Sequence, residues 1–96
     1  MRKIEKDMLE ALTKGVTMTK GNTQVVINSD GSKDVYLFGN KICHQLRHGQ
    51  RLYNDCGWVT STTASRLHAL GANVRRCNGV FVRLDGKGWL FNKWNG

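Results

Sequence analysis

The chain has 96 residues, of which 40% are hydrophobic and 23% charged, with eleven glycines, no proline and a formal net charge of +8. This length and composition are typical of one globular domain, residues 1–96. No apolar run is long enough to cross a membrane, and the first residues lack the apolar stretch of a secretory signal. We therefore expect an intracellular protein whose three cysteines stay reduced.

The positive charge is unevenly distributed along the chain. Residues 1–34 contain six basic and five acidic side chains, a net charge of +1, whereas residues 35–96 contain nine basic and two acidic ones, a net charge of +7. The excess charge is expected on the folded β part of the chain. A field of this sign favours phosphate backbones, anionic membranes or acidic protein surfaces as partners.

Residues 2–14 are predicted to form a helix that ends at Gly15. Four apolar side chains recur there at helical spacing: Ile4, Met8, Ala11 and Leu12. The apolar stripe is narrow. With Gly15 included, this segment spans residues 1–15. We expect it either to pack on one side of a sheet, or to be loosely attached and bind a partner.

A series of short strands is predicted next. Thr23–Asn28 turns back at Asp30-Gly31 into Val35–Phe38, which is apolar on both faces and therefore central in the sheet. Gly39-Asn40 is expected to interrupt this strand as a bulge or kink. The chain resumes as Ile42–Arg47, turns around Gly49 and returns through Arg51–Asp55.

The hydrophobic pattern predicts the register of that last hairpin. A three-residue loop, His48–Gln50, would place Leu46 opposite Leu52 and collect the apolar side chains on one face. The same register puts Arg47 beside Arg51. Like charges across strands are unfavourable, so either solvent screens this pair or an anion binds between them.

The second half of the chain carries the clearest turn signals. Thr60–Thr63 offers several N-caps for a helix that ends near Leu70, and Trp58 is expected to pack beneath its first turn. Asn78-Gly79 and Asp85-Gly86 predict two tight hairpins. They imply a three-stranded meander over residues 74–77, 80–84 and 87–91. In that register Cys77 lies opposite Val80 and Arg75 opposite Val82.

These elements predict an α+β fold. It comprises an N-terminal helix, an antiparallel sheet of short strands, and one central helix followed by a C-terminal three-stranded β-meander.

Two blocks of the sequence carry a resemblance. Leu37-Phe38-Gly39-Asn40-Lys41-Ile42 fits the pattern L-x-G-N-x-I, and Gly57–Leu67 fits G-W-x-T-x-T-T-x-x-R-L. With the glycine-turn hairpin that follows, the chain resembles short uncharacterised proteins of tailed phages. The resemblance covers roughly residues 23–89. It implies a phage origin, and it implies no activity and no site residues.

Two basic clusters are candidate anion sites. Thr62, Thr63 and Arg66 could bind phosphate at a helix N-terminus, if Arg66 lies on the side away from the core; the alternative is a plain cap with a solvated arginine. Arg47 and Arg51 form a basic hairpin tip, for which the alternative is a solvated loop.

A third cluster lies on the predicted meander. Arg76, Phe81 and Arg83 share one sheet face, where arginines would bind phosphates and the ring would stack on a base. The alternative is that the first helix covers this face, with Phe81 in the core.

The sequence lacks a recognisable catalytic or metal-binding constellation. Cys43, His44, His48 and Cys56 give the spacing C-H-x3-H-x7-C, which fits no compact zinc framework. Gly86-Lys87-Gly88 belongs to a hairpin and does not precede a helix as a phosphate loop would. We therefore expect no metal, no cofactor and no enzymatic activity.

The sequence favours a small basic phage accessory protein of the host cytoplasm that binds DNA or RNA mainly through backbone phosphates. The alternative is an inhibitor that docks on an acidic surface of a host enzyme or defence complex. In that case the first helix or Trp94, with Lys93, would supply the contact. No membrane partner is expected, and pairing of an unprotected sheet edge with a second copy is a further expectation.

Overall fold

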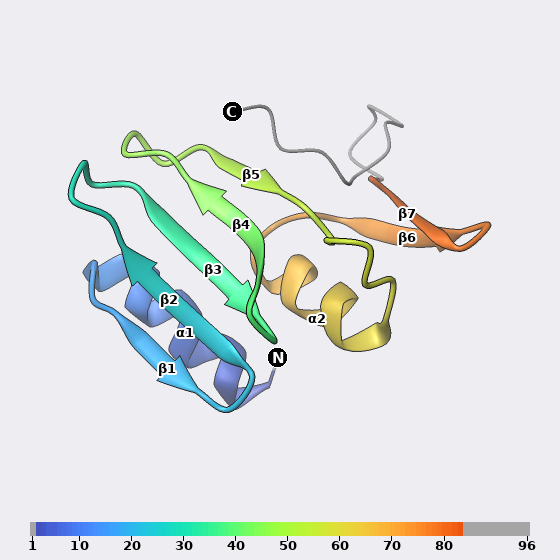
Figure 1. Cartoon of the computed structure of the whole chain (residues 1–96), viewed down its shortest axis with the longest axis horizontal. Helices are drawn as coiled ribbons and strands as arrows, with labels where there is room; N and C mark the ends of the chain where they lie inside the picture. The colour runs from blue at the N-terminus through green and yellow to red at the C-terminus, as the bar shows by residue number, and fades with distance from the viewer. Residues whose placement is uncertain (1, 84–96) are drawn as a thin grey trace.

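A computed structural model describes residues 2–83 of the chain (Figure 1). Helix α1 (Lys3–Lys14) comes first. A run of strands follows: β1 (Met18–Lys20), β2 (Thr23–Ile27), β3 (Lys33–Leu37), β4 (Asn40–Gln45) and β5 (Arg51–Tyr53). Helix α2 (Ser61–Ala69) and the hairpin of β6 (Val74–Cys77) and β7 (Val80–Arg83) complete the described chain.

The five strands between the helices form one antiparallel sheet in the order β1-β2-β3-β4-β5. Each strand therefore pairs with its neighbours in sequence, and β3 is central as its two-sided apolar pattern predicted. Val25 lies opposite Val35, which in turn lies opposite Cys43. The register of β3 and β4 shifts between Val35 and Tyr36, which marks a bulge.

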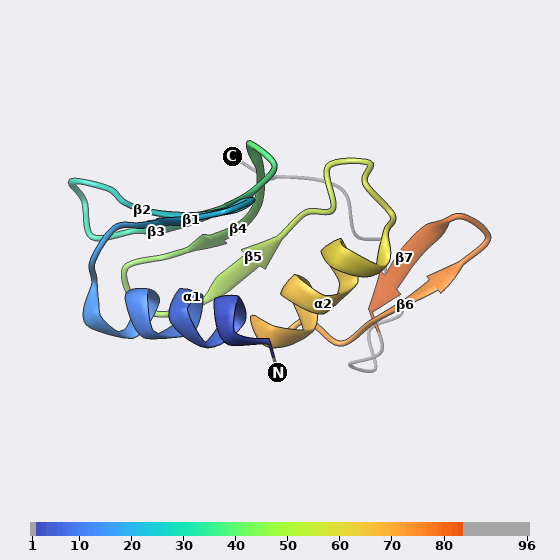
Figure 2. The same ribbon diagram turned by 90° about the horizontal axis from the view of Figure 1, so that it is seen from below.

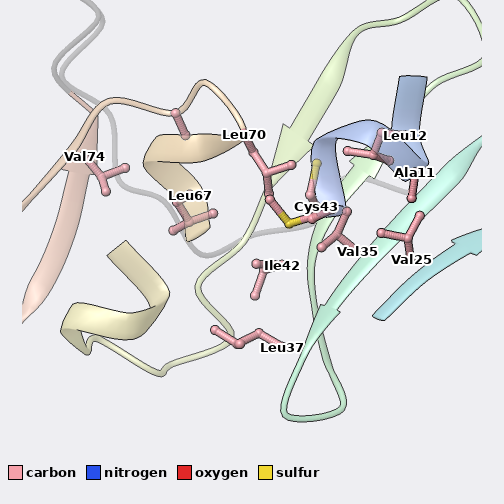
Figure 3. Packing of buried hydrophobic residues seen from close by; sticks show 12 residues of the cluster. Ala11, Leu12, Val25, Val35, Leu37, Ile42, Cys43, Leu67, Leu70 and Val74 are labelled. Atoms are coloured by element: carbon pink, nitrogen blue, oxygen red, sulfur yellow. The ribbon is translucent and has the colours of Figure 1, made fainter. Parts of the chain in front are cut away.

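Both helices lie on one face of the sheet, and the β6–β7 hairpin extends beyond the sheet at the end where α2 lies (Figure 2). The core fills the space between the sheet and the helices (Figure 3). It is built from buried apolar side chains of α1, the sheet, α2 and the start of β6: Met8, Ala11, Leu12, Val25, Val35, Leu37, Ile42, Cys43, Leu67, Leu70, Ala72 and Val74. Helix α1 is therefore part of the core and is not loosely attached.

A buried ion pair connects α1 to α2. The Glu5 and Arg66 side chains are each 3% exposed, and Arg66 Nη1 lies 2.8 Å from Glu5 Oε2. The guanidinium also donates to Thr23 Oγ1 at 3.0 Å and to Asn22 Oδ1 at 3.3 Å. This one side chain thus ties both helices to the start of β2.

The ends of both helices follow local rules. The Arg2 N–H at the start of α1 donates to Glu5 Oε1, and Gly15 ends the helix in the left-handed conformation at φ 69°. Thr60 caps α2 by accepting a hydrogen bond from the Thr63 N–H. The sequence predicted both helices within one or two residues.

The predicted arrangement of the sheet is wrong. The fold is α+β, but its main sheet comes early, between the two helices, and no C-terminal three-stranded meander follows α2 in residues 2–83. There only β6 and β7 pair, in the predicted register, and the expected strand 87–91 lies outside the described residues. Turn residues specify a hairpin locally, but they do not determine which hairpins join into one sheet.

Two further details of the sheet differ from the sequence prediction. Gly39 lies in the turn between β3 and β4, not in a bulge. His44 lies opposite Leu52 and Gln45 opposite Arg51, two residues away from the predicted register. The turn is closed by the Leu46 N–H, which donates to the Gln50 carbonyl at 2.8 Å, so the three-residue loop is 47–49 and not 48–50. Arg47 and Arg51 are therefore not cross-strand partners.

We predict that Glu5→Ala lowers the free energy of unfolding by about 3–5 kcal/mol, because it leaves the buried Arg66 guanidinium without its counter-ion. Urea unfolding measures the loss. The matched control is Glu10→Ala, since the Glu10–Lys14 pair is 60% and 64% exposed. The control should change stability by less than about 0.5 kcal/mol. Equal losses for the two variants would contradict a structural role for the buried pair.

The same pair predicts how stability depends on pH. Burial alone would raise the pKa of the Glu5 carboxyl, but hydrogen bonds from Ser65, the Arg2 backbone and Arg66 outweigh it and hold that pKa below 4.5. A lowered folded-state pKa stabilises the protein above pH 4.5, and this contribution is lost as pH falls through the folded-state value. Glu5→Gln should flatten the acid limb of the unfolding free energy measured against pH, and an unchanged limb would refute this.

Candidate functional site

A cleft lies between the β3–β4 turn and the connection from β5 to α2. Its volume is about 380 Å³. Apolar and hydroxyl side chains form most of its lining, with one carboxylate: Leu37, Phe38, Asn40, Ile42, Asp55, Trp58, Thr60, Thr62 and Thr63. Phe38 and Trp58 are 69% and 57% exposed. Two large aromatic side chains that stay exposed at one cleft are typical of an interaction site.

The β3–β4 turn forms one wall of the cleft, and its backbone is strained. Leu37 pairs with Asn40 across it, and its central residues, Phe38 and Gly39, have φ values of 51° and 78°. Positive φ at both positions is the requirement of a type I′ turn, which favours Asn-Gly. A bulky residue at positive φ is a genuine outlier. The turn therefore keeps Phe38 exposed at a cost in backbone strain.

The connection from β5 to α2 forms the opposite wall, and it also contains a non-glycine residue at positive φ. Cys56 has φ 56° and is followed by Gly57 at φ 81°. The preceding side chains hold this bend, since Asn54 Oδ1 accepts the Cys56 N–H and Asp55 Oδ1 accepts the Gly57 N–H, both at 2.8 Å. Strained backbone on both sides of one cleft is characteristic of functional sites.

Asp55 is 3% exposed and lines the cleft. One of its carboxylate oxygens accepts the Gly57 N–H, and within residues 2–83 the other oxygen has no donor and the carboxylate no ion-pair partner. The cleft therefore offers an acceptor, two aromatic rings and hydroxyl groups, and no cation among its lining residues.

The anion site expected at Thr62, Thr63 and Arg66 is not assembled as predicted. Arg66 was expected on the solvated side of α2, but it is buried against Glu5, and Thr63 is 1% exposed. A phosphate would have to displace Glu5 from the guanidinium. Only Thr62 of the three is partly exposed, and it lines the cleft.

The basic hairpin tip is divided between two environments. Arg47 is exposed in the β4–β5 turn, next to the turn that contains Gly31. Arg51 is half-buried, and its guanidinium donates to Gln45 Oε1 at 2.9 Å and to the Leu70 carbonyl at 2.8 Å. Arg51 thus neutralises the C-terminal end of α2, a structural task that a cation performs well there.

For the predicted cluster on the β6–β7 hairpin, the structure describes the backbone pairing but not the side chains. Arg76 pairs with Phe81 and Val74 with Arg83 across the β6–β7 hairpin, as the sequence predicted. The side chains of Arg76, Phe81 and Arg83 lie outside what the structure describes, as do Trp94 and Lys93. Their roles in binding therefore stay predictions.

The cysteines and histidines do not assemble into a metal site within residues 2–83, where no three candidate ligands lie together. Burial raises the pKa of the Cys43 thiol to about 12, so this buried thiol stays protonated. The His44 ring lies 2.5 Å from Asp34 Oδ1, which also pairs with Lys41 at 3.8 Å. No helix in the described residues has the length and apolar character that a membrane span requires.

Comparison with known families gives one match. A model of the Kyanoviridae Gp96 protein family matches residues 1–93. The chain belongs to this family. It is therefore a phage protein, as the resemblance of the two sequence blocks implied, and membership extends to α1 as well. No curated protein and no solved structure matches the chain.

Sequence reasoning missed the cleft, although two signals point to it. The two blocks quoted for the phage resemblance supply most of its walls, from Leu37 to Ile42 and from Trp58 to Thr63. The first signal was the Phe-Gly pair between two strands, which indicates a tight turn. The second was Trp58, which was expected beneath the first turn of α2 and instead stays more than half exposed, lining the cleft beside Thr60 and Thr62.

We predict that Phe38→Asn raises the free energy of unfolding by roughly 1 kcal/mol, because Asn tolerates the left-handed conformation and the exposed ring contributes little to packing. Thermal unfolding measures the change. Tyr36→Asn, in the neighbouring strand at ordinary φ, is the control and should destabilise. A loss of stability in Phe38→Asn would contradict the proposed strain.

Proposed function

We propose that this phage protein is a non-catalytic nucleic-acid-binding protein whose affinity comes mainly from contacts with backbone phosphates. The observation that supports this most directly is the distribution of ion pairs. Lys3, Lys14 and Lys20 pair with carboxylates close to them, whereas Arg47 and Arg75 form no ion pair within residues 2–83.

The matched cations are found on and around α1. Asp7 pairs with Lys3 and Lys20, and Glu10 pairs with Lys14. These contacts offset part of the positive charge around α1, where Arg2 and Lys6 form no ion pair within residues 2–83.

The exposed cations without ion pairs lie in the β4–β5 turn and in β6, whereas Arg51 of β5 binds the C-terminal end of α2. Arg47 and Arg75 form no ion pair with any residue between 2 and 83, and both are exposed. Asp55 is the only acidic residue of the described second half from residue 35 on. Positive charge without internal partners attracts a polyanion and releases its counter-ions on binding.

An acidic host protein would be attracted by the same charge, and this inhibitor hypothesis remains the second candidate. Of the anchors expected for it, α1 packs its apolar side chains into the core, and Trp94 and Lys93 lie outside the described residues. The nucleic-acid proposal is preferred because it needs only the exposed arginines that the structure describes.

The test is binding to a generic duplex and to a single strand over a salt series. Contacts with roughly four to six phosphates predict a log–log slope of about −3 to −5. Arg47→Ala and Arg75→Ala should each reduce the magnitude of that slope by about one. Lys14→Ala, which removes a cation already paired with Glu10, is the matched control. Lack of binding at about 50 mM salt would exclude this function, since phosphate contacts are strongest there.

A further inference from the structure

The cleft between Phe38 and Trp58 contains a feature that charge-driven binding does not use. Asp55 is almost completely buried, yet one carboxylate oxygen has no donor among residues 2–83. A buried acceptor without a partner is unfavourable, so a ligand that donates N–H groups there gains more than it would at an exposed acceptor.

The other lining groups restrict the shape of such a ligand. The rings of Phe38 and Trp58 offer flat apolar faces, and the hydroxyl groups of Thr60 and Thr62 lie at the N-terminus of α2. The cleft of about 380 Å³ is large enough for a nucleoside-sized group. A flat heterocycle with adjacent N–H donors matches these features.

We propose that this cleft binds an unpaired base of a single-stranded nucleic acid, with guanine as the best-matched base. This inference rests on the proposed function. The guanine N1–H and exocyclic amino group lie side by side on the Watson–Crick edge, where one carboxylate can accept both. The base stacks on Trp58 or Phe38, as bases of single strands stack on aromatic side chains in other proteins.

The N-terminus of α2 provides a place for the phosphate that accompanies the base. The nine-residue helix has no acidic residue in its first turn, so no charge of its own neutralises the positive end of its dipole. Thr60 Oγ1 accepts the Thr63 N–H, and the preceding amides of the first turn remain for an external acceptor. Thr62 contributes a hydroxyl at the same edge.

An arginine side chain of a partner protein has a similar pair of donors and also stacks on aromatic rings. The net charge of +8 decides between the two ligands. It repels a basic peptide during the encounter, whereas a guanine base arrives on a polyanion that the same charge attracts.

The backbone on both sides of the cleft is held in a fixed conformation without a ligand. Phe38 and Cys56 hold their left-handed conformations on opposite walls, and Cys56 Sγ donates to the Lys41 carbonyl at 3.0 Å. This contact joins the β5–α2 connection to β4. The aromatic rings are therefore positioned by strained but fixed turns, which reduces the ordering that binding requires.

The test compares two 12-nucleotide DNA strands by fluorescence anisotropy, using the full-length protein. One strand is all thymidine, and the other has two central guanines. We expect the guanine strand to bind at least about fivefold more tightly, the lower end of discrimination by a two-donor contact. Asp55→Asn and Trp58→Ala should abolish this preference while leaving the salt slope unchanged.

Two features keep the result interpretable. Asp30→Asn removes the same charge from an exposed turn and should preserve the guanine preference. Asn at position 55 can still accept the Gly57 N–H, and Trp58→Ala changes an exposed side chain, so both variants should fold, as circular dichroism will check.

Each remaining outcome counts against the inference. Equal affinity for the two strands, or a preference that survives both variants, would overturn the base site and leave charge-driven binding intact. No binding of either strand at about 50 mM salt would overturn the proposed function as well. Binding of N-acetylarginine amide that requires Asp55, without any guanine preference, would assign the cleft to a protein partner.

Discussion

The buried pair of Glu5 and Arg66 is the contact on which the arrangement of the helices depends. Its partners are separated by most of the chain, and Arg66 also bonds Thr23 and Asn22 at the start of β2. A charge buried this deeply is stable only with its counter-ion in place. The pair therefore fixes α1 and α2 on the same face of the sheet, and α2 in turn places Thr60 and Thr62 at the edge of the cleft.

This constraint separates structural charge from charge that a ligand can use. Two arginines are used by the fold itself: Arg66 pairs with Glu5, and Arg51 binds the C-terminal end of α2. Arg47 and Arg75 remain exposed and without ion pairs in the described residues. We propose different roles for the two features: the exposed arginines attract a polyanion, and the cleft selects among the bases that the polyanion carries.

Local patterns in the sequence predicted local structure well. The spacing around Met8, the hydroxyls before α2 and the Asn78-Gly79 turn gave both helices and the last described hairpin in its observed register. Long-range features were not predictable in this way. Glu5, the ion-pair partner of Arg66, is 61 residues away in the sequence, and no local pattern around Arg66 predicts this pairing. The cleft depends on two distant turns meeting, and Phe38 at positive φ contradicts the strand that its apolar character suggested.

The central claim is that a single strand contacts both the exposed arginines and the cleft. The most direct measurement is a titration of the isotope-labelled protein with a guanine-containing single strand, followed by NMR chemical shifts. The account predicts the largest shifts at the amides of Phe38–Asn40 and Gly57–Thr62 and at the Arg47 side chain, with the buried Arg66 side chain unchanged. Shifts confined to α1, or no shifts at low salt, would contradict it.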